Sequence, residues 1–150
     1  MNYQSVVNTL LQVIDDHLLI NESGYGNLSD IHTPEDERAP DYPYAFLNPI
    51  GITVGDSSSA FQFNLVIMDQ VIDGENSQAQ EIFVQSNCLM YLQDIISRFR
   101  ETTQNPLIDI AVTVNATPFK ERFEDNVAGV GAQITVQAGI PLGGCEAPYA

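Results

Sequence analysis

The fold is decided by the stretch Val130-Gly131-Ala132-Gln133-Ile134-Thr135-Val136-Gln137-Ala138-Gly139-Ile140, in which one apolar set alternates with a small or polar set. Such alternation has the period of a strand that buries one face. Upstream, residues 108–114 alternate in the same way and predict a second strand. Residues 115–128 between them are polar and mixed, which predicts the connecting part of a β-hairpin.

A helix is predicted directly before this hairpin, over about residues 78–99. Its apolar residues recur at helical spacing and predict one core-facing stripe. The stripe consists of Ile82, Phe83, Leu89, Leu92, Ile95, Ile96 and Phe99. Earlier still, two strand-like runs, 45–54 and 60–72, flank the polar loop 55–59 and predict another hairpin. Pro49 lies inside the first run, which predicts an edge position or a bulge there.

The first element is an amphipathic helix, predicted over residues 2–20. A long loop, 21–44, follows it, and a short irregular tail, 141–150, ends the chain. We therefore predict a single α+β domain over residues 1–150. Its order is helix, long loop, β-hairpin, helix, β-hairpin, and its four-stranded, mostly antiparallel sheet is covered by two helices.

The charge of the chain restricts its partners. Twenty acidic side chains face five basic ones, which gives a formal net charge of −15. This excess opposes binding to the outside of DNA, which needs Lys and Arg, and opposes binding to anionic membranes. The sequence holds no apolar run long enough to span a bilayer and no basic region at its start, so we expect no membrane partner and a cytoplasmic origin.

Residues suited to chemistry are few. His17 follows Asp15 and Asp16, and His32 lies in an acidic loop, so either could join carboxylates at a divalent metal. A solvated acidic loop explains His32 better than a metal site does. The chain contains no nucleophile, phosphate-binding or zinc motif. We therefore expect no enzyme activity, no cofactor and no metal site.

Aromatic residues in polar surroundings are candidates for contacts between subunits. Tyr25, Tyr42 and Tyr44 lie in or beside the long loop, where a tyrosine ring suits docking on a neighbour or packing on the parent domain. Residues 119–123 form a second cluster, which is both aromatic and basic. The residues predicted at a subunit interface are Tyr25, Tyr42, Tyr44, Phe119, Arg122 and Phe123.

The order of the elements, together with the segment 125–136 and the later Pro141 and Cys145, resembles the ring proteins of tailed phages. These are the tail-terminator, tail-completion and neck-ring proteins, and the chain looks most similar to those of crAss-like and other Bacteroidota phages. The resemblance implies a homo-oligomeric ring of six or twelve copies, built in the host cytoplasm and carried in the neck or tail of the virion.

The same resemblance implies partners and a role for the negative charge. The ring would contact the portal, an adaptor or other neck and tail rings, and genomic DNA would pass through its lumen without specific binding. The acids predicted on that lumen or on the surface are Asp30, Glu35, Asp36 and Glu37. Two alternatives remain open at this point, namely a small α+β enzyme or ligand-binding domain, and an acidic DNA-mimic inhibitor.

Overall fold

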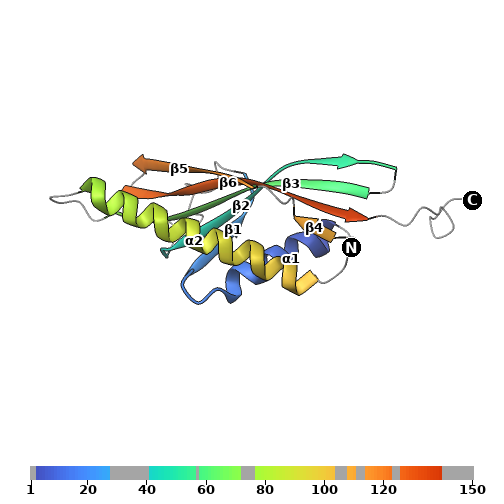
Figure 1. The fold of residues 1–150 in the computed structure, drawn as a ribbon, viewed down its shortest axis with the longest axis horizontal. Helices are drawn as coiled ribbons and strands as arrows, with labels where there is room; N and C mark the ends of the chain where they lie inside the picture. The colour runs from blue at the N-terminus through green and yellow to red at the C-terminus, as the bar shows by residue number, and fades with distance from the viewer. Residues whose placement is uncertain are drawn as a thin grey trace, which may run out of the picture.

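The computed structural model describes residues 3–27, 41–56, 58–71, 77–103, 108–110, 114–122 and 126–139. Its helices are α1 (Tyr3–Asp16) and α2 (Ser77–Thr103). Its strands are β1 (Glu22–Tyr25), β2 (Tyr44–Val54), β3 (Ser58–Gln70), β4 (Ile108–Ile110), β5 (Asn115–Arg122) and β6 (Asn126–Gly139). The strands form one elongated sheet, and α2 runs along it (Figure 1).

The six strands form one mixed sheet in the order β1-β2-β3-β6-β4, with β5 also paired to β6. The α+β class agrees with the sequence prediction, but the predicted four-stranded sheet is wrong. Strands β2, β3 and β6 are antiparallel neighbours, whereas β1 joins the edge of β2 in parallel. Strand β1 was not predicted, because a polar edge strand of four residues has no hydrophobic alternation by which it could be recognised.

A second correction concerns the polar segment 115–128, which was expected to connect two strands. Most of it is strand, since β5 pairs with β6 from Asn115↔Gln133 to Arg122↔Asn126. Strand β4 pairs with the other end of β6, so β4 and β5 follow one another along a single edge of the sheet. An edge strand tolerates polar side chains on both faces, which is why its pattern reads as a loop.

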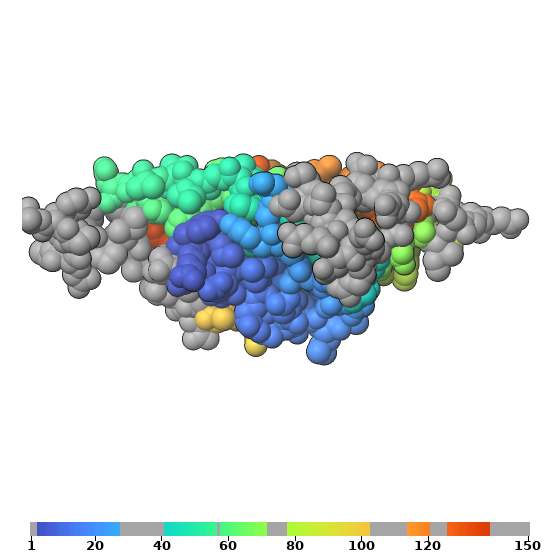
Figure 2. Space-filling view, turned by 180° about the vertical axis from the view of Figure 1, so that it is seen from behind, coloured from blue at the N-terminus to red at the C-terminus, as the bar shows by residue number. Residues whose placement is uncertain are grey.

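The main core lies between the sheet and the two helices. Strand β3 sends Phe63, Leu65 and Ile67 into it, all fully buried, and β6 adds alternate residues from Ala128 to Ala138. Helix α1 covers the sheet with one apolar face. Seen from behind, α1 and β1 lie next to each other below β2 (Figure 2). Pro49 lies at a register shift in β2, as its sequence position predicted.

A smaller cluster packs on the opposite face of the sheet. It is formed by Tyr44, Phe46, Met68 and Val127, with Tyr42, Val66 and Phe119 packed against it. Beside it, β6 passes so close to β3 that a Cβ on Gly129 would overlap the carbonyl oxygen of Ile67. Glycine is therefore required at this position for a close approach of two backbones.

Candidate functional site

The outer face of α2 carries large apolar side chains that the chain leaves in solvent. Ile82 is 59% exposed and Phe83 67%, and one heptad later Leu89 and Met90 are 40% and 47% exposed. A spacing of seven residues is two helical turns, so these four residues form one continuous surface, which we call the α2 stripe. Four side chains of this size expose roughly a few hundred Å², the size at which an apolar patch marks an interaction site.

The buried face of the same helix is a separate set of residues. Val84, Cys88, Tyr91, Leu92, Ile95 and Phe99 face the sheet and α1. The predicted core stripe is therefore wrong for Ile82, Phe83 and Leu89, which point away from the core. The missed signal is a second apolar repeat along the helix. Residues 82 and 83 recur at 89 and 90 and lie on a different face from residues 84, 88, 91 and 95. Helix α2 therefore has two apolar faces, whereas one was predicted.

The α2 stripe is also free of charge. Between Ser77 and Gln93 the only Asp, Glu, Lys, Arg or His residue is Glu81. Its carboxylate is 2.7 Å from the Lys120 ammonium on β5, and its side chain is only 16% exposed. Next to this pair, the Gln85 side chain donates a hydrogen bond to the Phe119 carbonyl oxygen at 3.0 Å. These contacts turn the charge and the hydrogen-bonding groups toward β5 and leave the outward face neutral.

A second exposed apolar surface lies on the distal half of β2. Ile50, Ile52 and Val54 are 47%, 53% and 76% exposed, and we call them the β2 ledge. Ile52 pairs with Phe61 of β3, which is buried in the main core. Since directly paired residues of an antiparallel sheet share a face, Ile52 points to the helix side of the sheet, as does Val54 two residues on.

The ledge is exposed because its neighbours end too early. The ring of Tyr3, in the first turn of α1, packs edge-on against Phe61 with ring centroids 5.5 Å apart. The helix begins there and covers no more of β2. On the edge of the sheet, β1 pairs with β2 only from Tyr44 to Leu47. Thus no element in the described part of the chain covers the ledge.

The aromatic residues predicted at a subunit interface lie mostly against their own chain. Tyr44 is buried in the smaller cluster, and Tyr42 and Phe119 pack against that cluster. Burial, followed by the charge of Glu22, raises the pKa of Tyr44 to about 12. Arg122, which was also predicted there, ends β5 opposite Asn126, and Phe123 lies outside the described residues.

Tyr25 is the one predicted interface tyrosine with a substantial exposed surface, at 42%. Its hydroxyl is 2.5 Å from the hydroxyl of Tyr3, a hydrogen bond that ties β1 to the start of α1. Burial, the hydrogen bond with Tyr25 and the charge interaction with it raise the pKa of Tyr3 to about 12, in that order of importance. The predicted acids Asp30, Glu35, Asp36 and Glu37 lie outside the described residues, as does His32.

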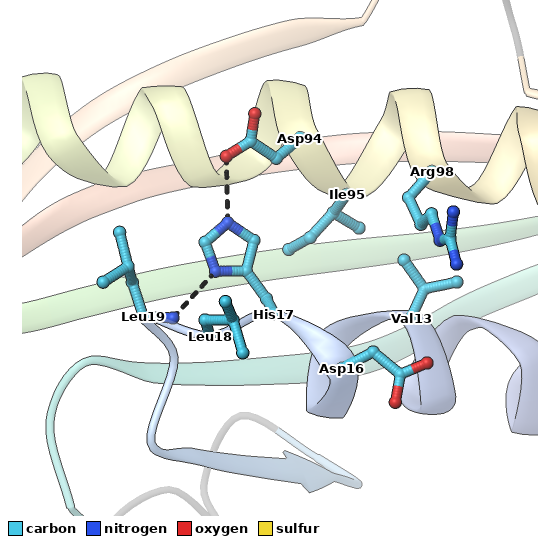
Figure 3. Close-up of a pocket in the computed structure, with 8 residues that line it drawn as sticks. All are labelled: Val13, Asp16, His17, Leu18, Leu19, Asp94, Ile95 and Arg98. Atoms are coloured by element: carbon cyan, nitrogen blue, oxygen red, sulfur yellow. Dashed lines mark hydrogen bonds and ion pairs between the residues drawn. The ribbon is translucent and has the colours of Figure 1, made fainter.

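His17 lines a pocket between the end of α1 and the second half of α2 (Figure 3). The pocket has a volume of about 560 Å³, within the range typical of small-molecule sites. Its lining consists of Val13, Asp16, His17, Leu18, Leu19, Asp94, Ile95 and Arg98. In the view of Figure 3, the His17 ring stands between Asp94 above and the backbone of Leu19 below.

The hydrogen bonds of His17 determine its chemistry. The Leu19 N–H donates to Nδ1 at 3.2 Å, so Nδ1 is an acceptor and the proton sits on Nε2. Nε2–H then donates to the Asp94 carboxylate at 2.9 Å. A general base needs a lone pair that is open to its substrate. Both nitrogens of His17 are already used inside the chain, so the arrangement joins the two helices and does not present a poised base.

Cys88 is the other group with intrinsic reactivity among the described residues. It is fully buried in the core, and burial, followed by the charge of Asp69, raises the pKa of its thiol to about 12. A buried thiol with a raised pKa is a poor nucleophile. The part of the chain that the structure describes also contains no group of three or more His, Cys, Asp or Glu side chains able to hold a metal ion.

Comparison with known proteins finds no protein-family model and no curated protein that matches the chain. Among the described residues, neither helix is long and apolar enough to cross a membrane. The surfaces described above are therefore the basis for a functional assignment.

Proposed function

We propose that this chain is a structural subunit that assembles with copies of itself into a ring in the neck or tail of a tailed phage, around the channel through which DNA passes. One observation carries the proposal. An otherwise strongly acidic chain exposes two uncharged apolar surfaces, the α2 stripe and the β2 ledge, on different parts of one domain. Solvent-exposed surfaces of this kind are typical of subunits that bury them on assembly.

The net charge fits the same role. Within the screening length of the solution, a net charge of −15 on the chain repels phosphate groups. A lumen lined by such subunits would repel DNA and let it slide. The resemblance of residues 125–136 to phage ring proteins points to the same assignment, and six or twelve copies are the expected numbers.

The geometry gives less support to an enzyme. His17 has no free nitrogen, and Cys88 is buried with a raised pKa. The pocket beside His17 has the volume of a ligand site, which keeps a ligand-binding domain as the second candidate. A metabolite that copurifies with the chain and is lost from a Leu18→Asp, His17→Ala double variant would favour that candidate.

Averaged electron cryo-microscopy of virions of the phage that encodes the chain tests the proposal. We expect the fold of Figure 1 in a closed ring on the channel axis of the neck or tail. The symmetry of that ring would give the copy number. Mature particles whose neck and tail density contain no such fold would contradict the virion role.

A further inference from the structure

The α2 stripe and the β2 ledge lie at opposite ends of the elongated molecule. Figure 1 shows α2 beginning at the left end of the elongated sheet and the turn between β2 and β3 lying at the right end. The stripe belongs to the first part of α2, and the ledge to the strand end beside that turn. The two apolar surfaces therefore cannot cover one another within one chain, but each can be covered by another molecule.

A second copy of this chain is the occupant that fits, because it brings an uncharged helix face to an uncharged strand face. Two copies that each carry −15 repel each other wherever their acids approach. Contact is least unfavourable where both surfaces are neutral. Strand β2 from Tyr44 to Val54 contains no charged residue, and the stripe contains none either. A basic partner would be attracted to the acidic surfaces of the chain and not to these neutral faces.

The shape of the ledge fits a helix. Helix α1 lies on the helix side of the sheet as far as Tyr3, whose ring packs against Phe61 and Phe63. Ile52 and Val54 continue this same face beyond the first turn of α1. A helix placed there would extend the existing helical layer, and the α2 stripe is an apolar helix face that the described part of the chain leaves exposed.

We propose that the α2 stripe of one copy packs on the β2 ledge of the next, with Phe83 and Leu89 against Ile52 and Val54. The inference rests on the proposed function, for which it names the subunit contact. It joins two different patches, so a pair of copies still has one free ledge, on the first copy, and one free stripe, on the second. Such a heterologous contact repeats from copy to copy and gives a ring when its rotation closes, whereas a stripe-to-stripe pair would stop at two copies and leave both ledges in solvent.

Cross-linking between single-cysteine chains tests the contact. The background carries Cys88→Ala and Cys145→Ser, and the reporters are Leu89→Cys on the stripe and Ile52→Cys on the ledge. One chain carries a mass tag, so each product can be assigned. At the highest soluble concentration, the mixture of the two reporters is expected to form a cross-linked dimer, and each reporter alone is not.

A matched control uses Gln137→Cys, on an exposed position of β6, mixed with Leu89→Cys. This pair should not cross-link above the level of random collision. Adding Phe83→Asp to the Leu89→Cys chain should lower the cross-linked yield on the order of tenfold, because it places a charge in an apolar contact.

Three results would overturn the inference. Cross-linking of Leu89→Cys with itself would indicate a stripe-to-stripe pair, and cross-linking of Ile52→Cys with itself would indicate pairing of sheet edges. A mixture that cross-links no better than the Gln137→Cys control would exclude the contact. The virion role is tested separately, by the density of the phage particle. A ring in that density whose subunits meet through other contacts would contradict this inference but not the virion role.

Discussion

The two helices of this protein use their apolar residues differently. Helix α1 buries Val6, Val7, Leu10, Val13 and Ile14 on one face. Its exposed positions are polar or acidic, as for Gln4, Asn8 and Asp15. Helix α2 buries one apolar face and exposes a second one, the α2 stripe. The first pattern stabilises a fold and nothing more, whereas the second leaves hydrophobic free energy available for a partner.

The difference also concerns how the helices are fastened. Helix α1 is held by its apolar face and by His17, which links its end to Asp94 of α2. Helix α2 is held by its buried face and by polar contacts from Glu81 and Gln85 to β5. These polar contacts fix the rotation of α2 about its axis and so determine which residues face outward.

The largest expected effect is the loss of a buried side chain from either helix. Leu10→Ala in α1 should lower the free energy of unfolding by about 2–5 kcal/mol, and Phe99→Ala in α2 by about 3–5 kcal/mol, because each leaves a cavity in the core. Urea denaturation followed by circular dichroism measures both. If Phe99→Ala costs no more than a surface substitution, α2 does not pack as described.

The next effect is the pH dependence that Cys88 confers on α2. Burial raises the pKa of this thiol from 9.0 to about 12, so the folded chain keeps a proton that the unfolded chain loses first. Stability should therefore fall as pH rises above 9, and the contribution should be lost at the folded pKa. Urea midpoints between about pH 8 and about pH 11 should decline less steeply in Cys88→Ala than in the unchanged chain.

Equal slopes in the two chains would mean that the thiol is accessible in the folded state. Tyr44, whose pKa is also raised to about 12, is present in both chains and contributes equally to both slopes. Slow labelling of Cys88 by a thiol reagent in the folded chain, and fast labelling in urea, would support the same conclusion.

A smaller effect is expected at the link between the helices. Asp94→Ala removes the carboxylate that accepts the hydrogen bond from His17 Nε2–H. Because the His17 side chain is only 13% exposed, the free energy of unfolding should fall by about 0.5–1.5 kcal/mol. Asp16→Ala is the control, because Asp16 lines the same pocket but accepts its hydrogen bond from Gln12 within α1, and it should stay within about 0.5 kcal/mol. Denaturation midpoints of the two variants that do not differ would show that His17 does not join the helices.

The smallest effect on the stability of the isolated chain is expected on the α2 stripe. Phe83→Ser should change the free energy of unfolding by no more than about 0.5 kcal/mol at low protein concentration, because the side chain is already 67% exposed. The same change at Leu10 should unfold the chain or nearly so. A large loss from Phe83→Ser would mean that the stripe is covered within its own chain, and the contrast between the helices would disappear.

Much of the sheet and both helices could be predicted from periodicity. The long runs of β2, β3 and β6 alternate over enough residues to be recognised, and α1 shows one clean apolar face. Strands β1 and β5 could not be recognised in this way. Both lie at edges of the sheet, where pairing is satisfied by backbone hydrogen bonds and side chains need no particular alternation.

The candidate site could be predicted only in part. The aromatic residues Tyr42, Tyr44 and Phe119 were recognised as notable, but their packing on the smaller cluster depends on strands that are distant in the sequence. The α2 stripe was visible as apolar residues, but its orientation was misjudged and Met90 was not included. Whether an apolar residue on a helix faces in or out depends on what packs against the other side.

The sequence by itself determined the α+β class, the strongly negative charge, the amphipathic first helix and the alternation of the central strands. These are local properties, set by residue type and by spacing along one element. The tertiary structure alone decided which face of α2 is buried, how far α1 and β1 cover β2, and hence which apolar residues remain exposed. The reason is physical, because burial belongs to pairs of surfaces brought together by the fold and not to either segment alone.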